Sequence, residues 1–274
     1  MAVIQVNTNS SRKKHSTMSQ EYNNIHVFDF NLICEYFSLI ERQGPGSSDM
    51  TLRALSFIDN LTAQSAVVDL GCGTGGQTMT LAQAIDAEIT GIDLSPGFVD
   101  KFNYNAAALN IQHRVKAIVG SMDNLPFQPE SLDLIWSEGA IYNIGFERGI
   151  NEWCNYLKTG GYIAVSEASW FSNVRPAEIQ AFWDTAYPEI DTIATKVGQL
   201  QKAGYTPVAT FCLPEYCWTD VFYKPQQEAQ RIFMEKYPNN PTAHALLANE
   251  KHEEKMYEQY KDYYGYVFYI ARKR

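Results

Sequence analysis

A glycine-rich stretch after a short apolar run is the segment of the sequence best suited to hold a ligand closely. Residues 66–78 read AVVDLGCGTGGQT, in which an acid precedes alternating glycines, namely Asp69, Gly71, Gly73 and Gly75. Glycine has no Cβ, so the backbone can approach a ligand and adopt positive φ. With Gly76 the same residues also spell G-x-G-x-x-G, which is typical of dinucleotide sites, so the turn alone leaves its ligand open.

A second acid ends the next strand-like segment, EITGIDL, where Asp93 is followed by Leu94. A carboxylate at the end of this strand can accept hydrogen bonds from both hydroxyls of a ribose. Nicotinamide enzymes have an acid at a similar place, so Asp93 does not distinguish the two ligand classes. Asp93 could also cap the helix that starts near Pro96.

Two further segments distinguish the ligands better. The stretch GSMDNLPF, residues 120–127, offers Met122 as a flat surface for a purine ring and Asp123 as an acceptor for an adenine amino group. The stretch DLIWSEGAIYNIG, residues 133–145, sets Ser137 and Glu138 at the end of a fourth strand.

Together these motifs resemble those of the class I S-adenosylmethionine-dependent methyltransferases, over residues 65–168. Within that class the chain looks like the small-molecule group that includes the ubiquinone and menaquinone methyltransferases, the type 11 domain. The segment RQGPGS, residues 42–47, also resembles a motif of bacterial members. The resemblance implies S-adenosylmethionine as the cofactor. Its implied contacts are Asp69, Gly71, Gly73, Gly75, Gly44 and Ser47 at the methionine portion, Asp93 and Leu94 at the ribose, Met122 and Asp123 at the adenine, and Ser137 towards the acceptor.

Methyl transfer depends mainly on positioning and on exclusion of water, and it needs a base only if the acceptor must lose a proton. Two residues are candidates for such a catalytic role. Glu138 lies at a strand end beside the expected cofactor, and His26 lies where an N-terminal helix could cover it. The alternatives are a buried structural carboxylate and a polar surface histidine.

Aromatic residues outside the regular core are candidates for the walls of an acceptor site. Tyr142 and Trp170 follow the fourth and fifth strands, and Trp218 opens a long insertion. Such walls would suit a flat or cationic acceptor. Ordinary packing in the core is the alternative for each of them.

These residues need a framework of alternating strands and helices, which the sequence between residues 66 and 168 provides. We expect an α/β fold, with a Rossmann-like seven-stranded sheet that is mostly parallel, an antiparallel last strand, and helices on both faces. Residues 1–20 are expected to be a mobile leader. Residues 21–274 are expected to form a single methyltransferase domain, with an N-terminal helical cap at 21–62 and a helical insertion at 214–262 before the last strand.

The composition narrows the possible partners and the location. The 274 residues carry a net charge of −9, which argues against nucleic acid as the main partner. No apolar run is long enough for a membrane span. The five cysteines are scattered and odd in number, which predicts reduced thiols in a cytoplasmic protein and no metal site. A homodimer remains possible.

The sequence therefore predicts an enzyme that transfers methyl from S-adenosylmethionine to a nitrogen or oxygen nucleophile of a small-molecule acceptor. Two other functions remain open, a nicotinamide-dependent oxidoreductase and a non-catalytic S-adenosylmethionine-binding protein. The sequence does not identify the acceptor.

Overall fold

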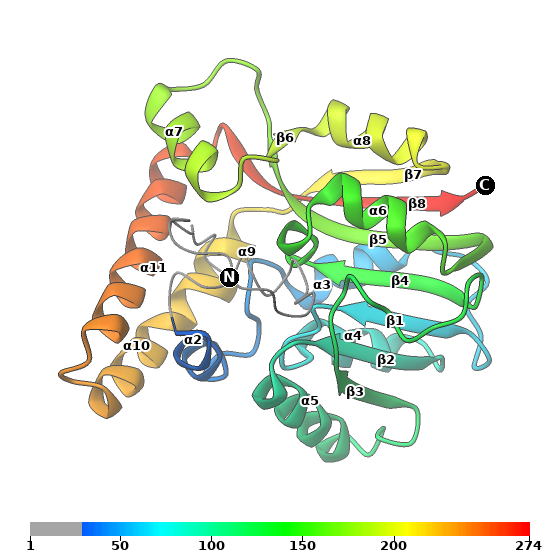
Figure 1. Ribbon diagram of the computed structural model, residues 1–274, viewed down its shortest axis with the longest axis horizontal. Coiled ribbons are helices and arrows are strands. Elements are labelled where there is room, and N and C mark those ends of the chain that lie inside the picture. Colours follow the sequence, from blue (N-terminus) through cyan, green and yellow to red (C-terminus); the bar gives the residue numbers. More distant parts are fainter. Residues whose placement is uncertain (1–28) are drawn as a thin grey trace, which may run out of the picture.

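A twisted sheet runs through the computed structural model, which describes residues 29–274 (Figure 1). Its strand order is β3-β2-β1-β4-β5-β8-β7. The strands are β1 (Ala66–Leu70), β2 (Glu88–Asp93), β3 (Val115–Val119), β4 (Leu132–Glu138), β5 (Leu157–Trp170), β7 (Tyr205–Cys212) and β8 (Tyr264–Lys273), with a short β6 (Asp191–Thr192) beside β5. Strands β1 to β5 pair in parallel, and β8 is antiparallel to both β5 and β7. The expected fold is thus confirmed.

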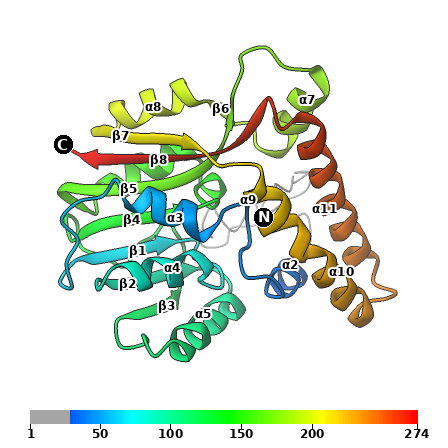
Figure 2. The ribbon, with the colours of Figure 1, turned by 180° about the vertical axis from the view of Figure 1, so that it is seen from behind.

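Helices cover both faces of the sheet because the buried strands carry apolar side chains on both sides. Val67 points into the core beneath α3, α4 and α5, whereas Val68 points into the core beneath α6 and α8. Figures 1 and 2 show these two layers from opposite sides. The helices are α3 (Ser48–Leu55), α4 (Gly76–Ala84), α5 (Pro96–Ala108), α6 (Phe146–Cys154), α7 (Ala177–Ala186) and α8 (Ile193–Lys202).

A separate group of helices stands beside the carboxyl ends of the parallel strands, on the left in Figure 1. It consists of α2 (Phe30–Phe37), α9 (Tyr216–Trp218), a π-helix (Thr219–Tyr223), α10 (Lys224–Lys236) and α11 (Pro241–Tyr260). The N-terminal α2 joins the group through Tyr36, whose hydroxyl donates to Gln226 Oε1 at 2.8 Å. Phe37 stacks on Phe222. No helix within residues 29–274 combines the length and the apolar character needed to cross a bilayer.

A buried ion pair links β5 to α8. Lys196 Nζ lies 3.4 Å from Glu167 Oε1, with side chains that are 1% and 0% exposed. The ammonium also lies 4.5 Å from the centre of the Phe146 ring. Burial raises the pKa of Glu167, and the charge of Lys196 opposes that rise. Each charge therefore depends on its partner to remain buried.

We predict that Lys196→Met lowers the free energy of unfolding by about 3–5 kcal/mol, because it leaves the carboxylate of Glu167 buried without a cation. The double variant Lys196→Met with Glu167→Gln should recover much of that loss, since no charge then remains. Denaturant unfolding of the three proteins measures both effects. Equal stability of the single and the double variant would contradict this account of the pair.

Candidate active site

The glycine turn between β1 and α4 forms the floor of a pocket. Gly71 has φ +70°, and a Cβ built on it would lie only 2.4 Å from Ala140 Cβ and 3.1 Å from Met122 Cε. Gly73 has φ +53°, and its amide donates to Asp93 Oδ2 at 2.9 Å. Side chains at these positions would meet both strain and steric conflict, so the sequence uses glycine there.

Asp69 lies behind the turn rather than in the pocket wall. It is fully buried, and its Oδ2 accepts from Thr78 Oγ1 and from Gln77 Nε2. Its Oδ1 has no hydrogen-bond partner among residues 29–274, and burial raises its pKa to about 7. Asp69 thus holds the start of α4 through these hydrogen bonds. Its contact with the methionine portion stays a prediction.

Asp93 stands in the pocket wall, as the sequence predicts, and Leu94 lines the wall beside it. The two carboxylate oxygens of Asp93 accept from separate backbone amides, Oδ2 from Gly73 and Oδ1 from Ser95, each at 2.9 Å. Burial raises the pKa of Asp93 to about 6, and the two amides oppose the rise. A carboxylate oxygen has more than one acceptor site, so both oxygens can still accept from neighbouring hydroxyls of a ligand.

Met122 and Asp123 separate in space although they are adjacent in sequence. Met122 lines the pocket, and its carbonyl accepts from Trp153 Nε1 at 2.8 Å. Asp123 accepts from Ser121 Oγ at 2.6 Å and faces Arg148, 3.6 Å away. It lines a neighbouring depression that includes Trp153. Asp123 thus lies outside the lining of this pocket, and its contact with an adenine stays a prediction.

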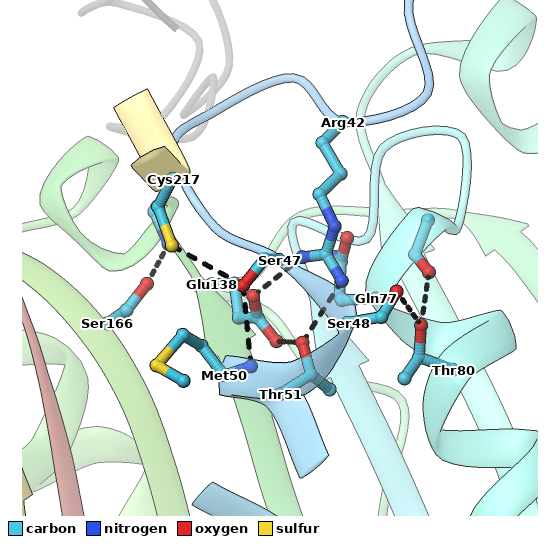
Figure 3. Close-up of polar contacts among 12 residues, drawn as sticks. Arg42, Ser47, Ser48, Met50, Thr51, Gln77, Thr80, Glu138, Ser166 and Cys217 are labelled. Atoms are coloured by element: carbon cyan, nitrogen blue, oxygen red, sulfur yellow. Dashed lines mark hydrogen bonds and ion pairs between the residues drawn. The ribbon is translucent and has the colours of Figure 1, made fainter. Parts of the chain in front are cut away.

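A buried ion pair connects the end of β4 with the segment before α3 (Figure 3). Glu138 Oε2 accepts from Arg42 Nη1 at 2.9 Å, and its Oε1 accepts from Thr51 Oγ1 at 2.7 Å and from Trp136 Nε1 at 2.9 Å. Both carboxylate oxygens are therefore engaged, and a guanidinium neutralises the charge. Glu138 lines the pocket, and these partners anchor the segment before α3 to the end of β4. The expected catalytic role of Glu138 stays a prediction.

The segment before α3 supplies one side of the pocket. Gly44 lines it together with Gln43 and Pro45. Gln43 Oε1 accepts from the amide of Thr74 at 3.0 Å, so this segment is bonded directly to the glycine turn. Ser47 does not line the pocket. It caps α3 by accepting from the amide of Met50.

The remaining predicted residues lie elsewhere. Ser137 is buried and donates to the carbonyl of Leu70 at 2.8 Å. Trp170 packs between Tyr264 and the guanidinium of Arg175, which lies 4.1 Å above its ring. The contacts of Ser137 and Trp170 thus lie in the core of the protein and not at the opening of a pocket.

Of the other aromatic candidates, Trp218 is 2% exposed and stacks on Tyr257 with ring centres 4.1 Å apart. Tyr142 is only partly buried, and its ring meets Tyr187 edge to face. The candidate base His26 lies outside the described residues. No group of histidine, cysteine and acidic side chains suited to a metal ion occurs within 29–274.

Five pocket residues were not predicted from the sequence: Phe30, Arg42, Gln77, Phe98 and Asn143. Arg42 and Gln77 stand inside the motifs quoted above, so the motifs located the right segments. Their side-chain directions depend on Glu138 and Asp69, which are distant in sequence or buried behind the turn. Asn143 lies on a short 3₁₀ helix (Ile141–Asn143) that sequence periodicity did not indicate.

The pocket fits the cofactor that the sequence resemblance implies. Asp93 can accept from a ribose diol, and the space above Gly71 and Gly73 admits a ligand close to the backbone. Met122 and Phe98 offer apolar surface for a purine, and Gln43 with Gly44 lies at the opposite side for the amino-acid portion. The site has the shape expected at the carboxyl ends of strands in an open α/β sheet.

Comparison with known proteins agrees with this geometry. Residues 67–161 match a family model described as "Methyltransferase domain". The chain is 30% identical over 155 residues to tocopherol O-methyltransferase of Arabidopsis thaliana, covering 56% of this chain and 40% of that protein. It is 29% identical over 140 residues to demethylmenaquinone methyltransferase of Symbiobacterium thermophilum, covering 50% and 56%. The chain thus spans about half the length of these curated relatives.

A solved structure shares the fold over most of the chain. It is a methyltransferase from Thiobacillus denitrificans in complex with S-adenosylhomocysteine, with a TM-score of 0.78 and 22% identity, covering 90% of this chain and 100% of that one. Residues 67–161 are thus similar to a methyltransferase domain, and the chain shares the fold of a solved methyltransferase over most of its length.

Proposed function

We propose that this protein transfers a methyl group from S-adenosylmethionine to a nitrogen or oxygen nucleophile on a small molecule. The observation that carries the proposal is the pocket itself. It runs from Asp93 across the glycine turn to Gly139 and Asn143, so a bound cofactor would extend from β2 towards β4. Relatives named for C-, O- and N-methylation all match this chain, and the choice of nitrogen or oxygen is part of the proposal.

The chain's own residues support this chemistry by holding and covering the cofactor. When bound, S-adenosylmethionine supplies an activated methyl group for in-line displacement at carbon. Asp93 would accept from the ribose, Met122 would support the purine, and Gln43 would hold the covering segment against the glycine turn. The segment before α3 is pinned by the pair of Arg42 and Glu138, which helps to exclude water from the reacting atoms.

One test of this function concerns the contact between Asp93 and the ribose of the cofactor. Asp93→Ala should weaken the binding of S-adenosylhomocysteine by roughly 1–3 kcal/mol, because a charged hydrogen-bond acceptor is lost. Glu88→Ala is a matched control, since Glu88 is exposed at the opposite end of the same strand. Calorimetry measures both affinities. If the two variants bind equally well, the ribose contact lies elsewhere.

The second prediction concerns pH. Asp93 and Asp69 have pKa values raised by burial to about 6 and about 7. Both carboxylates are ionised at pH 8, and both gain protons as the pH falls through this range, so Asp93 loses acceptor capacity. The affinity for S-adenosylhomocysteine should therefore decrease from pH 8 to pH 5.5, and the decrease should be smaller in Asp93→Asn. An affinity that is constant over this range would argue against an ionised Asp93 as the acceptor.

The third prediction tests the activity. Incubation with S-adenosylmethionine and a panel of amines and phenols should produce S-adenosylhomocysteine, and calorimetry with NAD should show no heat of binding. The Gly71→Val variant is the inactive control, because a side chain there would collide with Ala140. Profiling of a metabolite extract with an isotopically labelled methyl donor then identifies the acceptor. Binding of NAD without binding of S-adenosylmethionine would overturn the proposal.

A further inference from the structure

Charged side chains stand at both ends of the cofactor pocket. Within the described part of the chain, the charged residues of its lining are Asp93, Arg42 and Glu138. Asp93 and Glu138 each lie two residues beyond a strand partner of Asp69, so they stand at the same level on either side of β1. Two strand spacings, about 10 Å, separate the ends of β2 and β4. With Asp93 assigned to the ribose, Arg42 and Glu138 lie where a bound cofactor would place its amino-acid end.

The glycine turn has no spare backbone donor for the carboxylate of that amino-acid end. The amides of residues 71–75 donate to the carbonyls of Ile92 and Cys72, to the carboxylate of Asp93 and to the side chain of Gln43. Gln77 follows the turn, and its Nε2 donates to Asp69 at 3.0 Å and to the carbonyl of Cys72 at 3.3 Å. A buried carboxylate is costly without donors, so a ligand carboxylate at this end needs another one.

Arg42 supplies such a donor. Its Nη1 donates to Glu138 Oε2 at 2.9 Å, and its Nη2 donates to Thr51 Oγ1 at 3.1 Å (Figure 3). A guanidinium has five N–H groups, and these two bonds are the hydrogen bonds that Arg42 makes to residues 29–274. Arg42 is also the only cation among the described residues of the pocket lining. Its remaining N–H groups are therefore available to a ligand carboxylate.

Glu138 offers the matching acceptor for a ligand ammonium. Its Oε1 accepts from Thr51 and Trp136, whereas its Oε2 accepts from Arg42 alone among residues 29–274. A carboxylate oxygen has two acceptor sites, so Oε2 can accept one more hydrogen bond. Asp69 cannot take this role from the pocket, because it is 0% exposed and lies outside the lining.

The pair of Arg42 and Glu138 is tightly enclosed. A Cβ built on Gly46 would lie 3.1 Å from Arg42 Nη1 and 3.1 Å from Glu138 Oε2, so glycine lets the backbone pass closely over their contact. Both side chains are 5% exposed. Charges interact strongly where water is excluded. Because the pair is neutral as a whole, a ligand with only one charge would meet an attractive and a repulsive partner, whereas a zwitterion can match both.

We propose that Arg42 and Glu138 bind the amino-acid end of the cofactor, with the guanidinium on its α-carboxylate and Glu138 Oε2 on its α-ammonium. The ligand zwitterion and the protein ion pair then lie head to tail, so that each charge meets its opposite through a charge-assisted hydrogen bond. This inference rests on the proposed function, and it identifies the residues that select a methyl donor with an intact amino-acid end. The same two residues hold the segment before α3 in place.

The test titrates the full-length protein by calorimetry with four ligands. They are S-adenosylhomocysteine, its decarboxylated analogue, its deaminated analogue, and 5′-methylthioadenosine, which lacks the whole amino-acid end. We expect the wild-type protein to bind the decarboxylated and the deaminated analogue each about tenfold more weakly than S-adenosylhomocysteine, because one charged hydrogen bond is lost in each.

Three variants complete the test. The double variant Arg42→Met with Glu138→Gln removes both charges together, so it should lose both preferences and bind 5′-methylthioadenosine as the wild-type protein does. Glu138→Gln alone keeps the size of the side chain, and it should lose the preference for the amino group while it keeps the preference for the carboxylate. Arg53→Met is the matched control, because it removes an exposed cation from α3 and should keep both preferences.

The outcomes separate this inference from the proposed function. A purely structural role of the pair would weaken the binding of 5′-methylthioadenosine and of S-adenosylhomocysteine equally in the double variant, and that result would overturn the inference. A wild-type protein that binds all three amino-acid analogues equally, or preferences that persist in the variants, would also overturn it, while the proposed function stands. If the double variant does not fold, Glu138→Gln decides. If the wild-type protein does not bind S-adenosylhomocysteine, both the proposed function and this inference fail.

Discussion

The ion pair between Arg42 and Glu138 is the interaction on which the assembly of this site depends. It joins the end of β4 to a segment that precedes the whole sheet in sequence. Thr51 adds α3 to the same carboxylate, and Trp136 contributes an indole donor from the strand itself. Because both charges are about 5% exposed, removal of either would leave the other buried and unpaired. The pair thus holds the segment before α3 against the pocket.

The acidic residues have different roles because their surroundings differ. Asp69 and Asp93 end adjacent strands, yet one fixes the glycine turn from behind and the other faces the pocket. Glu138 is occupied by donors, and Glu167 is matched by Lys196. Asp69, Glu250 and Glu253 are deeply buried and form no ion pair within residues 29–274. These contrasts in burial and partner, more than residue type, indicate which carboxylates are available to ligands.

The features that the sequence could predict were local. The turn of Gly71 to Gly75 and the strand end at Asp93 depend on neighbours within a few residues, so their pattern indicated both the fold and the pocket floor. The direction of Asp123 also depends on Arg148, which comes from α6, so the sequence around Asp123 does not determine it. Trp170 was expected at the mouth of the sheet and Trp218 in the long insertion, and the packing of their rings depends on β8 and α11, far away in the chain. Side-chain direction set by such distant partners leaves no periodic signal in the sequence.

The position of α9, α10 and α11 between β7 and β8 has a consequence for how this architecture can change. In topological terms the three helices are the loop of a β-hairpin, because β7 and β8 pair directly with each other. The sheet, the glycine turn and Asp93 are complete without them. A loop of this kind can be exchanged as a unit while the hairpin register holds its ends in place, so this side of the molecule can vary without disturbing the glycine turn and Asp93.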